Sequence, residues 1–171
     1  MTRKICYVTG TRADFGLMKL TLQAIYDDKD LDLGIVVTGT HLSDRYGYTA
    51  REVEKAKLPI AAYLHVDVEP ASGSTMAMGI ATVLSRLVGI LTEIRPDIIM
   101  LLGDRGEMLA GAIAATHLCI PIVHVHGGER SGTVDEPIRH AISKLSHYHL
   151  VATTGARDRL IRMGESPNRV E

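Results

Sequence analysis

The segment Gly132–His140 holds a dense group of side chains that could do chemistry. It offers, in order, two adjacent carboxylates, a proline, an arginine and a histidine. Pro137 suits the first position of a helix, and Asp135 or Glu136 stands where a cap belongs. A helix start presents unpaired backbone N–H groups to an anion, and Arg139 one turn in could pair with that anion. An ordinary capped helix with a charged exposed side explains the same pattern equally well.

A second candidate is the glycine turn that follows the first apolar run. The segment Thr9–Arg12 could hold a phosphate on backbone N–H groups, with Arg12 as a clamp. It is neither the three-glycine dinucleotide motif nor a Walker loop, which removes support for NAD and ATP as ligands. A plain strand-to-helix turn is an equally good interpretation.

A third candidate is Asp104, which closely follows the run Ile98–Leu102, apolar at every position. A carboxylate at the end of such a strand is a good candidate for a raised pKa and for work as an acid or base. The alternative is an aspartate that caps the next helix and pairs with Arg105. We favour the functional interpretation because the strand end faces the presumed cleft.

Two histidines, His124 and His126, stand two residues apart in a predicted strand and therefore on one face of it. With Glu129 or Asp135 they would make a plausible zinc set. The alternative is that His126 transfers protons beside carboxylates while His124 packs in the core. A pair of histidines is more often not a metal site, so no metal is expected.

Short apolar runs alternate with helical patterns along the whole chain. The predicted strands are Ile5–Thr9, Leu33–Thr38, Ile60–Val66, Ile98–Leu102, Ile122–His126 and His149–Ala152. The predicted helices are Ala13–Tyr26, Asp44–Ala56, Ser74–Ile94, Gly106–His117, Glu136–Leu145 and Gly155–Met163. Strand–helix alternation with short connections predicts an α/β fold, a doubly wound parallel sheet of the Rossmann-like kind with right-handed crossovers.

In such a sheet, ligands bind beyond the carboxyl ends of the strands. Four predicted strand ends deliver glycine together with charged or imidazole side chains to that edge: Thr9–Asp14, Thr38–His41, Gly103–Glu107 and Gly127–Gly132. Chance could supply one such junction, but four are hard to dismiss. The sequence therefore predicts a site at this edge of the sheet.

The composition excludes several classes of protein. The 171 residues suit one domain, with a net charge of −1 and scattered lysines and arginines. Nucleic-acid binding needs a concentrated basic face or aromatic platforms, and this chain has one Phe and no Trp, so no nucleic-acid partner is expected. No signal peptide and no apolar stretch long enough to span a membrane are found, which predicts a cytoplasmic protein. Cys6 and Cys119 lie in apolar runs and are expected to be buried, reduced thiols.

Taken together, these motifs resemble those of the hydrolysing UDP-N-acetylglucosamine 2-epimerases of sialic-acid-type biosynthesis. The resemblance covers essentially the whole chain and rests on five segments: Thr9–Asp14, Gly39–Leu42, Gly103–Arg105, His124–Glu129 and Ser131–His147. The last segment is long enough to be highly specific. Members of this family have a glycosyltransferase-B-like architecture of two domains, about twice the length of this chain. The resemblance therefore implies that residues 1–171 form the amino-terminal domain alone, which fits Asn168–Glu171 looking like the start of another strand.

The resemblance also implies an activity. The family reaction eliminates UDP from UDP-N-acetylglucosamine to leave a 2-acetamidoglucal, and then hydrates that alkene to N-acetylmannosamine. No cofactor is implied. The expected partners are the UDP-sugar, a carboxy-terminal domain that supplies most uridine contacts, and a second copy in a homodimer, with no membrane partner.

By position, the resemblance assigns roles to particular residues. Asp104 and Asp135 would do acid–base work, while Arg139 and His41 would support the substrate and its charge. The expected substrate contacts are Arg12, Asp14, Arg105, Ser131 and Gly132. Of these, the two arginines would meet the nucleotide or its diphosphate.

One departure concerns His126, where animal members of the family carry a catalytic glutamate. Either the His126 imidazole takes the proton-transfer task, with Glu129 nearby in the same loop, or the division of labour differs. The same chemistry on a UDP-2,4-diacetamido-trideoxyhexose is therefore an alternative. Others are a glycosyltransferase-B-type transferase and a non-catalytic sugar-nucleotide-binding or dimerising fragment. The helix Ser74–Ile94 could offer a dimer contact, although core packing explains its apolar residues equally well.

Overall fold

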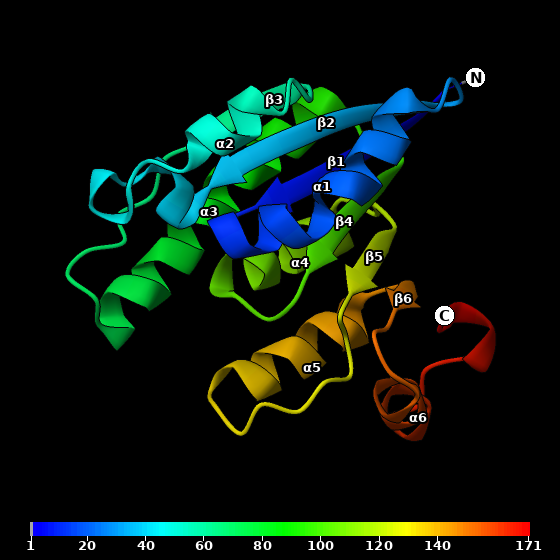
Figure 1. The fold of residues 1–171 in the computed structure, drawn as a ribbon. Helices are drawn as coiled ribbons and strands as arrows, with labels where there is room; N and C mark the ends of the chain where they lie inside the picture. The colour runs from blue at the N-terminus through cyan, green and yellow to red at the C-terminus, as the bar shows by residue number, and fades with distance from the viewer. Residues whose placement is uncertain (1) are drawn as a thin grey trace.

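A parallel sheet of six strands runs through residues 2–171, the part of the chain that the computed structural model describes (Figure 1). The strands are β1 (Arg3–Thr9), β2 (Leu31–Thr38), β3 (Ile60–Leu64), β4 (Ile98–Leu102), β5 (Ile122–Val125) and β6 (Tyr148–Leu150). Their order across the sheet is β3-β2-β1-β4-β5-β6, and every neighbouring pair is parallel. This confirms the predicted doubly wound, Rossmann-like fold.

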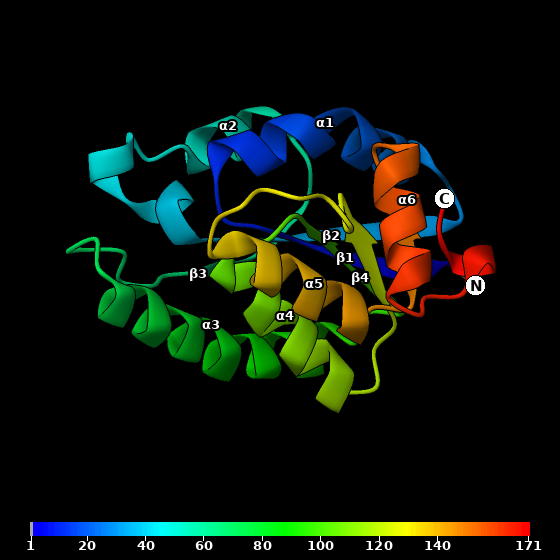
Figure 2. The same ribbon diagram turned by 90° about the horizontal axis from the view of Figure 1, so that it is seen from below.

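Helices connect the strands and cover both faces of the sheet. The α-helices are α1 (Arg12–Asp27), α2 (Ala50–Lys55), α3 (Gly73–Ile94), α4 (Gly106–His117), α5 (Asp135–Leu145) and α6 (Thr154–Arg162). Figure 2 shows α1 and α2 on one face of the sheet and α3, α4 and α5 on the other. Short 3₁₀ turns cover Gly39–Leu42, Asp44–Tyr46 and Pro167–Arg169.

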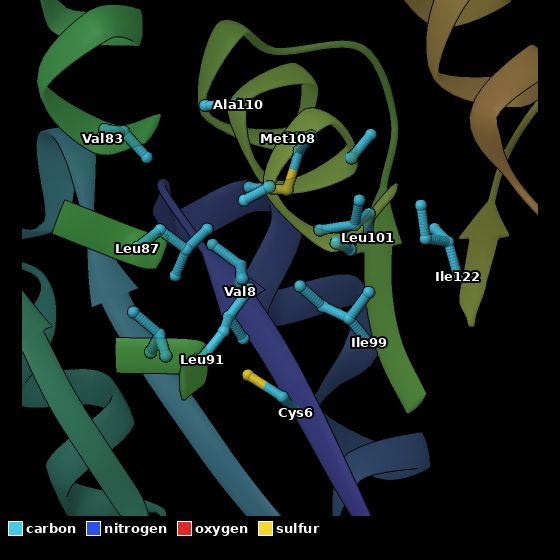
Figure 3. Close-up of a cluster of buried hydrophobic side chains, with 14 of the residues drawn as sticks. Cys6, Val8, Val83, Leu87, Leu91, Ile99, Leu101, Met108, Ala110 and Ile122 are labelled. Carbon is cyan, nitrogen blue, oxygen red and sulfur yellow. The ribbon is translucent and has the colours of Figure 1, made fainter. Parts of the chain in front are cut away.

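The alternation of side chains along the strands divides the core into two clusters. On β1, Ile5 and Tyr7 belong to the cluster that includes side chains of α1 and α2, whereas Cys6 and Val8 belong to the cluster that includes those of α3 and α4. Figure 3 shows this second cluster. Strands that are buried on both faces have no polar side to expose, which explains why their sequences are apolar at nearly every position.

The structure differs from the prediction at Asp44–Ala56, which is not one continuous helix. A 3₁₀ turn covers Asp44–Tyr46, and α2 begins only at Ala50. Between them, Gly47 has φ 82° and Tyr48 has φ 45°. Both values are left-handed, so a right-handed helix cannot pass through these residues.

Residues at the end of the described chain pair with β6. Val170 forms an isolated parallel bridge with His149, and the Glu171 N–H donates to the His149 carbonyl at 2.9 Å. The expectation that Asn168–Glu171 begins a strand is confirmed in part, because a 3₁₀ turn over Pro167–Arg169 precedes the pairing.

Only one of the two cysteines is buried as expected. Cys6 lies in the core, and desolvation there raises the pKa of its thiol to about 12. The prediction for Cys119 is wrong, because this residue is exposed in the turn that follows α4, at φ 56°. Its neighbours Leu118 and Ile120 contact the core, and the reversal of the chain between them leaves the thiol outside.

The helix α3 bears on the expectation that no apolar stretch could span a bilayer. This helix has 22 residues and is long and apolar enough to do so by length and composition alone. Arg86 and Glu93 are the only charged residues of the helix. In the structure Val83, Leu87 and Leu91 pack in the core, while Met78 and Val88 are exposed.

Candidate active site

The four strand ends that the sequence predicts to form a site lie next to one another. They follow β2, β1, β4 and β5, which are consecutive strands of the sheet. The chain moves outward from β1 to β2 and β3, and outward on the other side from β4 to β5 and β6, so the switch point falls between β1 and β4. Ligands of doubly wound sheets bind at that point. We call the loops at this edge the rim: Gly10–Thr11, Gly39–Leu42, Gly103–Arg105 and His126–Val134.

An ion pair between Asp104 and Arg139 joins two parts of the rim. Arg139 Nη2 donates to Asp104 Oδ2, and Arg139 Nη1 donates to the Glu129 carbonyl oxygen at 3.0 Å. Both side chains are largely buried, with 11% of Arg139 and 20% of Asp104 exposed. The pair therefore ties the end of β4 to α5 and to the loop after β5. Within residues 2–171 the buried Arg139 Nε has no acceptor.

A buried histidine provides a second tie between the same elements. His124 Nε2 lies 2.7 Å from the Gly103 carbonyl oxygen, and Nδ1 lies 3.0 Å from Ser143 Oγ on α5. Because a carbonyl can only accept, we assign the ring proton to Nε2, so Nδ1 accepts from the Ser143 hydroxyl, which shares its single proton with the Arg139 carbonyl oxygen at 3.1 Å. Gly127 leaves room for this contact, since a Cβ there would lie 2.9 Å from Nδ1.

This arrangement rules out the zinc set considered from the sequence. Both ring nitrogens of His124 are used in hydrogen bonds within the protein, so neither is free for a metal. His126 has φ 60° and has already left the strand, so it does not continue the alternation that would place it beside His124. Among residues 2–171 no group of three or more His, Cys, Asp or Glu side chains could hold a metal ion.

The glycine turn after β1 is organised by Asp14 of α1. Asp14 Oδ2 accepts from the Gly10 N–H at 3.0 Å and from the Thr11 N–H at 2.9 Å, while Oδ1 accepts from the Thr9 hydroxyl. The phosphate expected on these N–H groups is therefore replaced by an internal carboxylate. Asp14 is 5% exposed, and burial raises its pKa even though its hydrogen bonds oppose that shift.

His41 belongs to the rim segment Gly39–Leu42, but its side chain is buried and contacts the turn after β1. It is completely buried; Nε2 lies 3.0 Å from Thr9 Oγ1 and Nδ1 lies 2.8 Å from Thr49 Oγ1. Desolvation lowers the pKa of His41, although the Asp14 charge opposes this. At this depth His41 and Asp14 can influence a ligand only through the backbone and hydroxyls that they hold.

Two arginines remain available to an anion at the rim. The Arg12 side chain is 72% exposed and pairs with Glu52, with 2.9 Å between Nε and Oε1. The Arg105 side chain is 48% exposed, and its Nε lies 3.5 Å from Glu107 Oε2. Surface ion pairs of this kind are weak and exchange readily, so either guanidinium could bind a diphosphate.

Glu107, in the first turn of α4, packs against the rim; from the sequence it was included in the strand end Gly103–Glu107 but given no role. Its carboxylate, in a side chain 13% exposed, lies against the backbone of Gly10 and Gly39. A Cβ on Gly39 would lie 2.6 Å from Glu107 Oε1, and Gly39 also has φ +60°. The glycines of the two turns therefore leave room for the Glu107 carboxylate. The sequence did not reveal this contact, because Gly10 and Gly39 are far from Glu107 along the chain.

The loop between β5 and α5 brings the other predicted site residues to the rim. His126 is half-buried. Glu129 Oε1 accepts from Thr153 Oγ1 at 3.3 Å, so its carboxylate points toward the start of α6 while its carbonyl serves Arg139. Asp135 is the first residue of α5, and its Oδ2 accepts from Thr133 Oγ1 at 3.2 Å.

Glu136 occupies the backbone N–H groups of Ser131 and Gly132, two residues that were expected to contact the substrate. Its Oε2 accepts from the Ser131 N–H at 2.9 Å and from the Gly132 N–H at 2.8 Å. These two donors lower the pKa of Glu136. The structure thus brings Asp104, Arg139 and Glu129 into contact, places Asp135 beside the loop, and gives both glycine turns an internal carboxylate.

Comparison of the sequence with models of protein families identifies the family to which this chain belongs. A model described as UDP-N-acetylglucosamine 2-epimerase matches residues 23–171. The chain belongs to this family. The resemblance to UDP-N-acetylglucosamine 2-epimerases drawn from the motifs is thereby confirmed at the level of the family.

Curated relatives of the family are substantially longer than this chain. It is 56% identical over 165 residues to the UDP-N,N'-diacetylbacillosamine 2-epimerase (hydrolyzing) of Legionella pneumophila, covering 96% of this chain and 44% of the relative. It is 42% identical over 165 residues to a UDP-N-acetylglucosamine 2-epimerase of Neisseria meningitidis, covering 96% of this chain and 43% of the relative. The chain therefore spans less than half the length of either relative.

Solved structures of epimerases share the fold. A UDP-GlcNAc 2-epimerase from Neisseria meningitidis, solved bound to UDP-GlcNAc, has a TM-score of 0.86 at 20% identity, covering 98% of this chain and 44% of that one. The Methanocaldococcus jannaschii UDP-GlcNAc 2-epimerase has a TM-score of 0.80 at 23% identity, covering 98% and 44%. At these identities the likeness shows the fold alone, which is the Rossmann-like half of a glycosyltransferase-B-type architecture.

The buried His124 predicts a measurable dependence of stability on pH. Burial lowers the pKa of His124 from 6.5 to about 4. Between these two pKa values the unfolded chain takes up a proton that the folded chain does not, so the free energy of unfolding decreases as pH falls below 6.5, the pKa of the unfolded chain. Between pH 7 and pH 5 the loss from this one group amounts to about 2 kcal/mol. Urea denaturation at both pH values should show it in the wild type and lack it in His124→Asn.

The control for this prediction is a direct titration of the wild-type ring. His41 and His149 shift in the same direction, so only the difference between wild type and variant reports on His124. NMR should find the His124 ring neutral at pH 5. An equal pH dependence in both proteins, or a charged ring at pH 5, would contradict the assignment.

Proposed function

We propose that this chain is part of a hydrolysing 2-epimerase that acts on a UDP-2-acetamido sugar. A base removes the C2 proton, the C1–O bond to the diphosphate breaks, and UDP leaves a 2-acetamidoglucal. Water then adds at C1, and a proton returns to C2 on the opposite face, which inverts that carbon. The observation that carries the proposal is the largely buried Asp104–Arg139 pair at the rim of a chain that belongs to the 2-epimerase family.

The residues of the rim meet the needs of this chemistry. The elimination requires a proton acceptor and a stabiliser of negative charge, and the hydration requires the proton to be returned. Asp104 and Asp135 share these proton transfers, with Arg139 orienting Asp104 and stabilising charge. Arg12 and Arg105 bind the diphosphate.

The remaining predicted residues take supporting roles in this proposal. His41 and Asp14 hold the turn after β1 from below. His126 transfers a proton in the place of the glutamate of the animal members, while Glu129 orients Arg139 through its carbonyl. The Ser131–Gly132 turn meets the sugar through its outer surface, since Glu136 takes its N–H groups.

Two substrates fit this chemistry: UDP-N-acetylglucosamine, which would give N-acetylmannosamine, and a UDP-2,4-diacetamido-trideoxyhexose. The higher identity to the Legionella pneumophila diacetylbacillosamine enzyme than to the Neisseria meningitidis enzyme supports the second substrate. His126, a departure from the animal members, supports it as well.

The proposal includes a second domain and a cytoplasmic location. The chain spans less than half of the relatives described above, and residues 1–171 are proposed to be their amino-terminal domain. The other domain would close the cleft over the rim and supply the uridine contacts. The isolated 171-residue chain is expected to turn over no substrate.

The proposal predicts release of UDP from UDP-2-acetamido sugars by the full-length protein. Incubation with each candidate substrate should yield UDP and the free 2-epimeric sugar, resolved by ion-exchange chromatography. Asp104→Asn removes the proposed proton acceptor and should lower kcat by roughly 10²–10⁴-fold. The matched control is Asp158→Asn, which changes an exposed aspartate on α6.

Two outcomes would count against this prediction. Absence of UDP release from every UDP-2-acetamido sugar would overturn the epimerase, and transfer of the sugar to an acceptor would identify a transferase instead. An Asp104→Asn variant with the kcat of the wild type would leave the epimerase standing but remove Asp104 from the chemistry.

A homodimer formed through α3 is also proposed. Exposed residues without charge form most of the outer face of α3: Ala77, Met78, Ala81, Ser85, Val88 and Gly89, with the exposed Arg86 and Glu93 beside them. The apolar side chains on this face gain by leaving water, and the six residues named carry no charge that a second copy would oppose. The family resemblance adds the expectation of a dimer.

This proposal predicts that a charge on the outer face of α3 dissociates the dimer. Val88→Glu would bury an unpaired carboxylate between two copies, which is strongly unfavourable. Analytical ultracentrifugation of the full-length protein should show a dimer for the wild type and monomer for the variant. Leu20→Glu on α1, where the side chain is 83% exposed, is the matched control and should remain dimeric. A wild-type monomer, or a dimer unaffected by Val88→Glu, would contradict the proposal.

A further inference from the structure

Glu136 closes the loop that precedes α5 onto the helix. In addition to the Ser131 and Gly132 N–H groups on Oε2, its Oε1 lies 3.8 Å from Arg130 Nε and 3.9 Å from His140 Nε2. The Glu136 carboxylate thus connects the start of the loop, Arg130–Gly132, to the first turns of α5. A glutamate that only complemented the helix dipole would need none of these partners.

The loop has few other anchors. Val134 is 68% exposed, so no apolar side chain of the loop fixes it to the core at that position. Gly132 takes φ +67°, a conformation that costs little only for glycine. Two further links are short-range: the Glu136 N–H donates to the Thr133 carbonyl at 3.2 Å, and Ser131 Oγ lies 3.2 Å from Thr133 Oγ1.

Asp135 depends on the shape of this loop. It stands immediately before Glu136, its N–H donates to Thr133 Oγ1 at 3.3 Å, and its Oδ2 accepts from the same hydroxyl at 3.2 Å. The loop position of Thr133 therefore sets the position of the Asp135 carboxylate. Thr133 directly follows Ser131 and Gly132, whose N–H groups Glu136 binds, and its own carbonyl accepts from the Glu136 N–H.

We propose that Glu136 is a positioning residue, which fixes the Ser131–Val134 loop so that Asp135 reaches the reacting sugar. The inference rests on the proposed function, since it takes Asp135 as an acid–base residue. Glu136 itself does not exchange protons with the substrate, because its carboxylate is turned back onto the loop N–H groups. Misplacement of a catalytic group by about 1 Å can cost 10²-fold in rate.

Three substitutions in the full-length protein separate positioning from proton transfer. Glu136→Gln keeps an oxygen that can accept from both N–H groups, Glu136→Asp keeps the charge but is too short to reach them, and Glu136→Ala removes both properties. If Glu136 only positions the loop, kcat should fall roughly 10–100-fold in the Ala and Asp variants, with KM changed little. In the Gln variant kcat should stay within about threefold of the wild-type value. Proton transfer by Glu136 would reverse the order, with Asp the most active variant.

The controls separate this inference from the proposed function. Glu54→Ala, at an exposed position on α2, should leave kcat unchanged, and thermal unfolding of every variant checks that it is folded. UDP release by the wild type with undiminished kcat in Glu136→Ala would overturn the positioning role and leave the epimerase standing. If the wild type releases no UDP, the proposed function fails, and hydrogen exchange still decides the role of Glu136 in the loop. Faster exchange at the Ser131 and Gly132 amides in Glu136→Ala would support it, and unchanged exchange would overturn it.

Discussion

The Asp104–Arg139 ion pair is the interaction on which the arrangement of the rim depends. Each partner comes from a different βα unit, and the Arg139 guanidinium also holds the Glu129 carbonyl. The buried His124 connects the same two elements, because its ring contacts both the Gly103 carbonyl after β4 and Ser143 on α5. Because the two side chains are largely buried, removal of either one would leave an uncompensated charge, so the pair fixes α5 against the end of β4. A strand end, a helix and a loop are thereby held as one unit at the switch point of the sheet.

The second constraint is that both glycine turns are already bound by carboxylates of the chain. Asp14 takes the N–H groups after β1, and Glu136 takes those before α5. Backbone donors that could have held phosphates instead fix the shape of the turns. In the proposed function, anion binding therefore falls to side chains at the rim, of which Arg12 and Arg105 are exposed.

The sequence predicted the fold well because the apolar strands and amphipathic helices repeat one local pattern. It also predicted that four strand ends would meet, since parallel strands share their carboxyl edge. It could not predict how deeply a side chain is buried: His41 and Asp14 were expected to contact the substrate, but their side chains turn toward the interior of the protein. Glu107 received no role because the glycines that it contacts, Gly10 and Gly39, are distant in the sequence. The break at Gly47 and the exposure of Cys119 depend on left-handed residues, which apolar patterns do not reveal.

Proton exchange at C2 of the sugar is the step that distinguishes this chemistry from glycosyl transfer or simple hydrolysis. The most direct measurement is the reaction of the full-length protein with its UDP-2-acetamido sugar in D₂O, with the free sugar analysed by NMR and mass spectrometry. Elimination followed by hydration predicts one deuteron at C2 of the 2-epimeric product, because the proton returned to that carbon comes from solvent. A released sugar that keeps its original C2 proton and configuration would contradict the proposed reaction.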